Sequence, residues 1–488
     1  MALFRLPCAL ILSISLLVLS ACTTVGPDYV VPDESVFRQE GAASGFVSAD
    51  EPTYVAYDLP HDWWRLYDSE VLNELVAMAL AANSDLRIAA ANLSRSQAIL
   101  EEARTLSNPV FDVGAGAAFG RSATPHGTPR QADHWFYDAG IGISYQLDLF
   151  GRIARAIEAA TADMEAMRAA RDLVRITVVA DTTRAWLGIC ASGHQIDVAS
   201  HSVSLQERVV TTTERLAQGG RATELDVSRA RAQLEQLKAA VPPLVAQQRT
   251  AIFQLAVLTG NLPDALPERY VQCSSIPQLS QRVPVGDGAM LLSRRPDIRQ
   301  TERILAAATA RIGVATADLY PSISLGLSLG QAGTLSNFGS GNAFYWALGP
   351  LISWVLPATG PARARISQAE AATQAALADF DGAVLNALKE VESALTLYAR
   401  ELDRNAALKD ARDQSALASR QAHQLYNFGR TDFLTTLDAD RTLAEFESRL
   451  AESDALVARY LVNLFLALGG GWNDSPPDCP CGPDEDEQ

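Results

Sequence analysis

The chain has 488 residues, 48% of them hydrophobic and 20% charged, which is enough apolar material for one large or two ordinary cores and argues against intrinsic disorder. Its formal net charge of −17 repels polyanions, and it contains no basic run interleaved with aromatic residues. These properties argue against a nucleic-acid partner.

The first 21 residues have the architecture of a signal peptide. One basic side chain, Arg5, precedes an apolar core at residues 9–19, and small residues then lead to Cys22. The run Leu-Ser-Ala-Cys fits a lipoprotein cleavage box. We therefore expect cleavage after residue 21 and acylation of the Cys22 thiol, for example by palmitate, which makes Cys22 the first residue of the mature chain.

No later stretch supplies the roughly eighteen continuous apolar residues of a membrane helix. The best candidate, residues 460–468, is too short. If the mature chain crosses a membrane, it does so without helices.

The two halves of the sequence repeat each other. The aligned blocks are NSDLR with RPDIR, SYQLDLFG with SWVLPATG, and LAQGGRATELD with LYNFGRTDFLT. One unit of the repeat predicts a helix, two strands, a very long helix, a turn and a returning helix. We place the first repeat at residues 83–260 and the second at residues 295–468.

Four stretches alternate between apolar and polar side chains and predict strands. They lie at about residues 110–119, 136–149, 322–331 and 344–356. Each has about the length of a tilted transmembrane strand, and aromatic residues gather at the ends. An ordinary half-buried sheet also alternates. The opposite face here consists mostly of Gly, Ser, Asp and Gln, which favours a water-filled lumen.

Four strands cannot close a barrel, and an open sheet edge in lipid leaves backbone groups without partners. Several chains must therefore share one barrel. Two chains would supply eight strands around an interior filled with side chains, whereas three would supply twelve and leave a passage.

The remaining parts of each repeat are rich in strong helix formers, and no proline stands between Pro129 and Pro242 or between Pro361 and Pro476. The expected long helices are residues 151–217, 223–259, 361–427 and 431–468, with Pro361 in a first helical turn. A helix over 151–217 extends on the order of 100 Å at about 1.5 Å per residue. An elongated coiled-coil spacer is the simpler alternative, which these helices alone do not exclude.

The turns between the long and the returning helices lie at the end farthest from the strands. They contain Gly219, Gly220 and Arg221 in the first repeat, and Gly429 and Arg430 in the second. We call these two segments the tip turns.

The sequence offers no catalytic or metal-binding constellation. The six histidines stand in unrelated contexts, and the chain lacks an H-E-x-x-H, G-x-S-x-G or P-loop motif. Cys190 and Cys273, like the C-x-C pair Cys479 and Cys481, are interpreted as structural or incidental. We predict no enzyme, no cofactor and no metal; an exported lipoprotein enzyme remains a formal alternative.

Four motifs give the chain its family resemblance. They are CTTVGPDYVVP at the expected mature start, YQLDLFGRI at a strand-to-helix junction, RRPDIRQTE at the second half, and LGGGW at its end. With the duplicated tip turns, they resemble the TolC-like outer-membrane factors. Within that family, the likeness is to the NodT-type lipoproteins of resistance-nodulation-division efflux systems, and it runs from Cys22 to about Trp472.

The resemblance implies a mainly helical fold with a transmembrane β-barrel. It implies a homotrimer with a twelve-stranded barrel in the outer membrane, a periplasmic α-helical tunnel and an equatorial domain. We assign residues 22–82 to the N-terminal linker and equatorial segment, 261–294 to the equatorial connector and 469–488 to a C-terminal tail.

The function implied is a passive exit duct of a tripartite efflux pump for drugs or other toxic small molecules. Its partners would be a periplasmic membrane-fusion adaptor, docked at the tip turns, and an inner-membrane pump of the resistance-nodulation-division type. A duct for type I protein or peptide secretion is the main alternative, and a structural coiled-coil lipoprotein is a weaker one. The expected location is the outer membrane, spanned by the barrel and anchored by lipid, with a periplasmic extension.

The resemblance also implies a periplasmic aperture near the tip turns. Leu434 and Asp438 match the constricting leucine and aspartate of the family, and Asp226 and Tyr426 match an inter-helix hydrogen-bond pair of its closed state. The arginine that completes this latch is displaced here, because Arg430 stands one position before the matching residue. Three Asp438 carboxylates around a threefold axis would favour cations.

Overall fold

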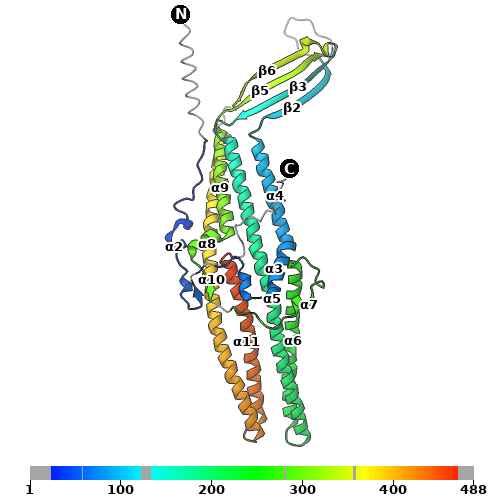
Figure 1. The fold of residues 1–488 in the computed structure, drawn as a ribbon, viewed down its shortest axis with the longest axis vertical. Coiled ribbons are helices and arrows are strands. Elements are labelled where there is room, and N and C mark those ends of the chain that lie inside the picture. The colour runs from blue at the N-terminus through cyan, green and yellow to red at the C-terminus, as the bar shows by residue number, and fades with distance from the viewer. Residues whose placement is uncertain are drawn as a thin grey trace, which may run out of the picture. The chain divides into compact units, whose positions relative to one another are not determined.

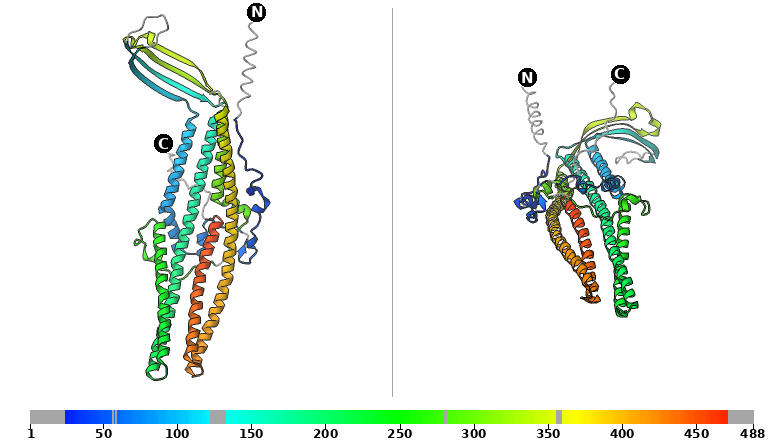
Figure 2. Two further views of the ribbon diagram at one scale, coloured as in Figure 1. Left: turned by 180° about the vertical axis from the view of Figure 1, so that it is seen from behind. Right: turned by 60° about the horizontal axis from the view of Figure 1, so that its bottom comes forward.

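The computed structural model describes residues 24–55, 57, 59–121, 133–279, 282–354 and 359–470. The predicted signal peptide, Cys22 and the tail from residue 471 lie outside these ranges. The chain forms two compact units (Figure 1, Figure 2). The first consists of the described parts of Met1–Ser35, Asn92–Arg168 and Gln300–Phe380, and the second of those of Val36–Ala91, Ala169–Arg299 and Asp381–Gln488. Each unit therefore takes segments from both repeats.

The duplicated order of helix, strand, strand, long helix and helix is confirmed. In the first repeat it consists of α4 (Ser84–Thr105), β2 (Val110–Gly120), β3 (His134–Leu147), α5 (Arg152–Gln218) and α6 (Glu224–Leu258). In the second it consists of α9 (Pro296–Ala317), β5 (Ser322–Thr334), β6 (Phe344–Ser353), α10 (Thr359–Asn427) and α11 (Phe433–Ala467). The strands and the adjoining helix ends belong to the first unit.

The four strands form one antiparallel sheet in the order β2-β3-β5-β6 (Figure 1). Because side chains alternate along each strand, the register aligns whole rows of similar residues. One row is Val113, Ile141, Leu329 and Trp346, and a row on the opposite face is Asp112, Gly142, Ser328 and Ala347. The alternation in the sequence therefore gives the sheet one apolar face and one face of small or polar side chains.

Glycines on the polar face make room for two larger side chains. Tyr345 lies over Gly140 and Gly330, where a Cβ atom would come 3.1 Å and 2.7 Å from its hydroxyl. A Cβ on Gly142 would meet the Asp112 carboxylate at 2.3 Å. Tyr345 is thus on the glycine face, whereas its neighbour Trp346 is on the apolar face.

The starts of the two long helices differ between the repeats. Asp148 caps α5, since its carboxylate accepts from the backbone N–H of Ile153 at 3.1 Å and of Ala154 at 2.8 Å. This carboxylate is stabilised by the positive end of the helix dipole. In the second repeat α10 begins at Thr359 and carries Pro361 in its first turn, where a missing N–H costs nothing.

The second unit contains residues 36–82 of the N-terminal segment and residues 261–294 of the connector, and these two parts pair with each other. The short elements before α4 are η1 (Val36–Arg38), α2 (Glu40–Ala43), η2 (Val47–Ala49), β1 (Tyr54–Val55), η3 (Trp63–Tyr67) and α3 (Glu70–Ala82). Those between the repeats are α7 (Glu268–Val271), β4 (Val283–Pro284) and α8 (Gly288–Arg294). Strand β1 pairs in parallel with β4, although the two are more than 200 residues apart.

The core of the second unit lies under these segments. Trp63 is fully buried, and its ring centroid is 4.8 Å from that of Phe465 near the end of α11. Tyr54 donates from its hydroxyl to the carbonyl oxygen of Leu395 in α10 at 2.7 Å. The N-terminal segment is thereby fastened to helices of the second repeat.

Cys190 in α5 and Cys273 in the connector form a disulfide. The sequence left open whether these two cysteines are structural or incidental and did not pair them; the disulfide shows that they are structural. Gly193 allows the approach, because a Cβ there would lie 2.1 Å from the carbonyl oxygen of Cys273. Cys479 and Cys481 lie outside the described residues.

Candidate functional site

The two tip turns have the same backbone geometry. Gly220 and Gly429 adopt φ values of +70° and +69°, which L side chains rarely adopt. Gly220 donates to the carbonyl oxygen of Ala217, and Gly429 donates to that of Tyr426, both at 2.9 Å. Each glycine thus ends a long helix in a left-handed cap.

The residues that follow the glycines complete the same motif. The N–H of Arg221 donates to the carbonyl oxygen of Leu216 at 2.8 Å, and that of Arg430 donates to the carbonyl oxygen of Leu425 at 2.9 Å. This double hydrogen bond is a Schellman motif, and it explains why the aligned blocks share Gly-Arg. Both arginine side chains are exposed.

The helix after each tip turn begins with a cap that pairs a threonine with an aspartate. The capping residue is Thr223 in α6, whereas it is Asp432 in α11. In α6 the Thr223 hydroxyl oxygen accepts from the N–H of Asp226, and the Asp226 carboxylate accepts from the Thr223 hydroxyl at 2.7 Å. In α11 the Asp432 carboxylate accepts from the N–H of Thr435 at 2.9 Å and from its hydroxyl at 2.6 Å. The first pair is a capping box and the second is a simple N-cap.

These hydrogen bonds lower the pKa of both carboxyl groups. The pKa of Asp226 is lowered first by the bond from the Thr223 hydroxyl and next by the bond from the Thr223 N–H. The pKa of Asp432 is lowered by the corresponding bonds from Thr435. Both effects stabilise the ionised form, as expected for a carboxylate that accepts bonds at a helix N-terminus.

The predicted aperture residues all lie at or near the tip turns of the second unit. Leu434 is 50% exposed, and Asp438 and Arg430 are exposed as well. Tyr426 places its ring 6.1 Å from that of Phe433.

The expected latch is not formed within the single chain. Among the described residues Asp226 makes no hydrogen bond with Tyr426. Its Oδ2 accepts instead from the N–H and the hydroxyl of Thr223, the residue that caps α6. The predicted aperture would bring together side chains of three chains, so the single chain does not test it.

A polar cluster near the tips escaped the sequence analysis. Asp440 in α11 accepts from the Ser419 hydroxyl at 2.7 Å and bonds Nε2 of His423 at 2.9 Å. The sequence did contain a sign of part of this cluster, because Ser419 and His423 are four residues apart and such residues share a face of a helix. Among the described residues no bond joins Ser419 to His423, so the cluster is not a nucleophile activated by a base.

This cluster borders a cavity of about 390 Å³ between the ends of α5, α6, α10 and α11. Its wall is largely apolar and includes Val209, Leu216, Leu237, Phe433 and Leu437. The two hairpins near their tips are therefore not packed as tightly as a protein core.

The described part of the chain holds no group of three or more His, Cys, Asp or Glu side chains placed to bind a metal ion. Within the same ranges, no helix combines the length and apolarity needed to span a membrane.

Comparison with known proteins identifies relatives over nearly the whole chain. The family model for outer membrane efflux proteins matches residues 75–261 and 289–470. Nodulation protein T of Rhizobium leguminosarum bv. trifolii is 27% identical over 465 residues, which cover 94% of this chain and 96% of that protein. The solvent efflux pump outer membrane protein SrpC of Pseudomonas putida is 30% identical over 477 residues, 94% of this chain and 98% of that protein.

A solved structure gives the same result for the fold. The outer-membrane channel OprN superimposes with a TM-score of 0.86 at 35% sequence identity, and the match covers 92% of this chain and 100% of that one. The two ranges matched by the family model contain α4 to α6 and α9 to α11, so both repeats are recognised. The chain belongs to the outer membrane efflux protein family.

Proposed function

We propose that this outer-membrane efflux channel works as a homotrimer, in which three copies share one twelve-stranded barrel and one helical tunnel. The observation that carries the proposal is the four-stranded sheet with one apolar face and two edge strands, β2 and β6. Exposed edges in lipid are costly, and only closure removes them. Three copies supply twelve strands and leave an open lumen.

The channel is a passive duct with no catalysis of its own, so its partners must supply energy and select the cargo. We assign it a periplasmic membrane-fusion adaptor and an inner-membrane pump of the resistance-nodulation-division type. The tip turns with Gly219, Gly220, Arg221 and Gly429 are the adaptor docking points, because backbone hydrogen bonds close both turns in the same way and their surface is exposed.

The proposed cargo is small toxic molecules. Relatives of this chain are named for the efflux of solvents, toluene and antibiotics and for the export of pyoverdine, which is a range of small molecules.

The resting aperture is assigned to Leu434 and Asp438, with Asp226, Tyr426 and Arg430 around it. Around a threefold axis the exposed Asp438 carboxylate would form a ring with its two counterparts. Such a ring attracts cations and requires them to offset its self-repulsion.

We also assign residues 1–21 to a removed signal peptide and Cys22 to the acylation site. Residues 22–82 and 261–294 then form the equatorial segments. The pairing of β1 with β4 supports this grouping for residues from Val36 onward, because it joins the two segments within the second unit.

The proposed assembly is tested by the mass of the purified chain in mild detergent together with its conductance in a planar bilayer. A trimer that conducts ions is the expected result. A monomer contradicts the shared barrel, and a trimer without conductance contradicts the duct and favours the structural lipoprotein.

A further inference from the structure

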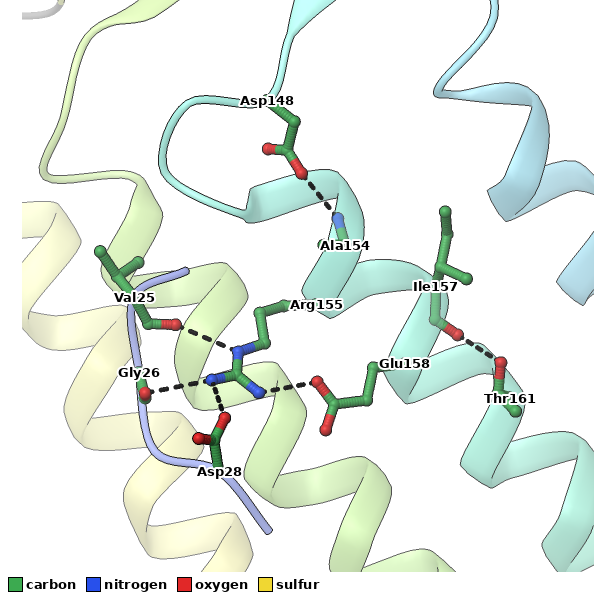
Figure 3. Close-up of polar contacts among 9 residues, drawn as sticks. All are labelled: Val25, Gly26, Asp28, Asp148, Ala154, Arg155, Ile157, Glu158 and Thr161. Atoms are coloured by element: carbon green, nitrogen blue, oxygen red, sulfur yellow. Dashed lines mark hydrogen bonds and ion pairs between the residues drawn. The ribbon is translucent and has the colours of Figure 1, made fainter. Parts of the chain in front are cut away.

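The first described residues of the chain lie against the start of α5, where Arg155 holds them (Figure 3). Its Nε donates to the carbonyl oxygen of Val25 and its Nη2 to that of Gly26, both at 3.2 Å. The guanidinium also bonds the carboxylates of Asp28 and Glu158, each at 2.7 Å. Its side chain is only 4% exposed, so this cation depends on these acceptors.

The segment of residues 24–29, which we call the strap, also makes two very close backbone contacts. Gly26 has a φ of +90°, and a Cβ there would lie 2.4 Å from the Cα of Gly313 in α9. Gly151 has a φ of +75°, and a Cβ there would lie 2.4 Å from the side chain of Thr24. A side chain at either glycine would displace the strap, so both positions require glycine.

Further contacts fix the two ends of the strap. The N–H of Val25 donates to the carbonyl oxygen of Phe150 at 3.1 Å, next to the junction between β3 and α5. The Tyr29 hydroxyl donates to Glu302 at 2.8 Å, and the guanidinium of Arg303 is 5.9 Å from the centre of the Tyr29 ring. A flexible tether would show none of these contacts.

We propose that Arg155 is a positioning residue for the lipid anchor, holding the strap so that the acyl chains on Cys22 enter the membrane beside the strand-to-helix junction. This inference rests on the proposed acylation of Cys22 and assigns it a place in the first unit. Cys22 precedes Thr24 by two residues, which span at most about 7 Å of extended chain.

The charge distribution agrees with this role. The Asp28 side chain is 91% exposed, so its bond to Arg155 is accessible to water, whereas Arg155 itself is buried. Removal of the guanidinium would free three acceptors of the strap at once. Removal of the Asp28 charge alone would leave the two backbone carbonyls bound.

The test compares hydrogen exchange at residues 24–29 in the full-length mature chain, purified in mild detergent, for wild type and Arg155→Met. Methionine keeps the aliphatic part of the side chain and removes every donor. We expect exchange to become roughly tenfold faster or more, the factor for one lost hydrogen bond to a charged group. Asp28→Asn, a change at an exposed position, should give a smaller acceleration.

Arg168→Met is the matched control, because Arg168 is exposed on the same helix and its side chain hydrogen-bonds only to Met164 among the described residues. It should leave exchange in the strap unchanged. The mass of the N-terminal peptide reports the lipid in the same samples, and the lipid should be present in every variant.

The possible failures are distinguishable. Lipid present with unchanged exchange of the strap in Arg155→Met overturns the role of Arg155, whatever the result for Asp28→Asn, and leaves the acylation intact. A wild-type peptide without lipid contradicts the acylation and, with it, the positioning role.

Discussion

At the scale of single residues, two carboxylates set the response of the tips to acid. The pKa values of Asp226 and Asp432 are lowered in the folded chain, so each ionised group stabilises its helix start at pH values above the ordinary carboxyl range. This stabilisation is lost as the pH falls below about 4, through the lowered folded-state values. At the first turns of α6 and α11, the protection of the amides from exchange, corrected for the intrinsic exchange rate at each pH, should therefore fall in acid.

The Asp432→Asn variant tests this prediction. Asparagine retains a cap acceptor but does not titrate. The start of α11 should lose its acid dependence in this variant, while the start of α6 keeps it. An α11 start that remains equally acid-sensitive would assign the effect to another group.

Asp438 is the residue on which the proposed aperture depends most. Asp438→Ala removes three charges and shortens three side chains near the axis of a trimer, so single-channel conductance should rise and divalent block should weaken by roughly tenfold or more, the factor for about 1.4 kcal/mol. Planar-bilayer recording measures both.

Asp438→Asn separates charge from size in the same experiment. It should weaken divalent block with little change in conductance at high salt. If both variants conduct and are blocked like wild type, Asp438 does not belong to the aperture.

At the scale of elements, the disulfide between α5 and the connector is the strongest single constraint on the second unit. It closes a loop between residues 83 positions apart, for which chain-entropy arguments give about 4 kcal/mol of stabilisation. The double variant Cys190→Ala, Cys273→Ala should therefore have a lower thermal midpoint than wild type. A reductant should lower the midpoint of wild type by a similar amount and leave the variant unchanged.

Many of the helix ends and strands could be predicted from the sequence, because they depend on residues that are close together in the chain. The Gly-Arg pairs at 220 and 429 mark left-handed caps, and strict alternation marks strands of one apolar face. Pro361 fits a first helical turn in the sequence and in the structure alike. Each of these signals lies within a few residues of the feature it predicts.

The features that the sequence did not reveal depend on contacts between distant segments. Nothing near Cys190 indicates Cys273 as its partner. Tyr345 stands in an aromatic run and fitted an interfacial girdle, but the glycines that accommodate its ring lie on β3 and β5. The cluster around Asp440 likewise required α10 and α11 to be placed side by side.

At the scale of the whole molecule, the proposed barrel predicts that the two faces of β2 tolerate charge differently. Val113 lies on the apolar face, and Val113→Lys should cost about 2–4 kcal/mol if that face meets the centre of the bilayer. The amount of channel assembled in the outer membrane should fall accordingly.

Gly114→Lys is the matched control on the opposite face. A Cβ at Gly114 meets nothing within 4 Å in the single chain, so the lysine has room toward a water-filled lumen. Equal loss of assembly in both variants would contradict the orientation of the sheet in a barrel.

The link between Cys190 and Cys273 also makes the two repeats topologically unequal. The first hairpin, with its tip turn at Gly220, is part of a covalently closed ring, whereas the second, with its turn at Gly429, has no such closure among the described residues. A protease cut after Arg221 would leave the chain in one piece on a denaturing gel until a reductant is added. A cut after Arg430 would release a separate C-terminal fragment at once. Cleavage by a periplasmic protease would therefore have different consequences at the two tip turns: the chain stays covalently connected after a cut in the first and is separated by a cut in the second.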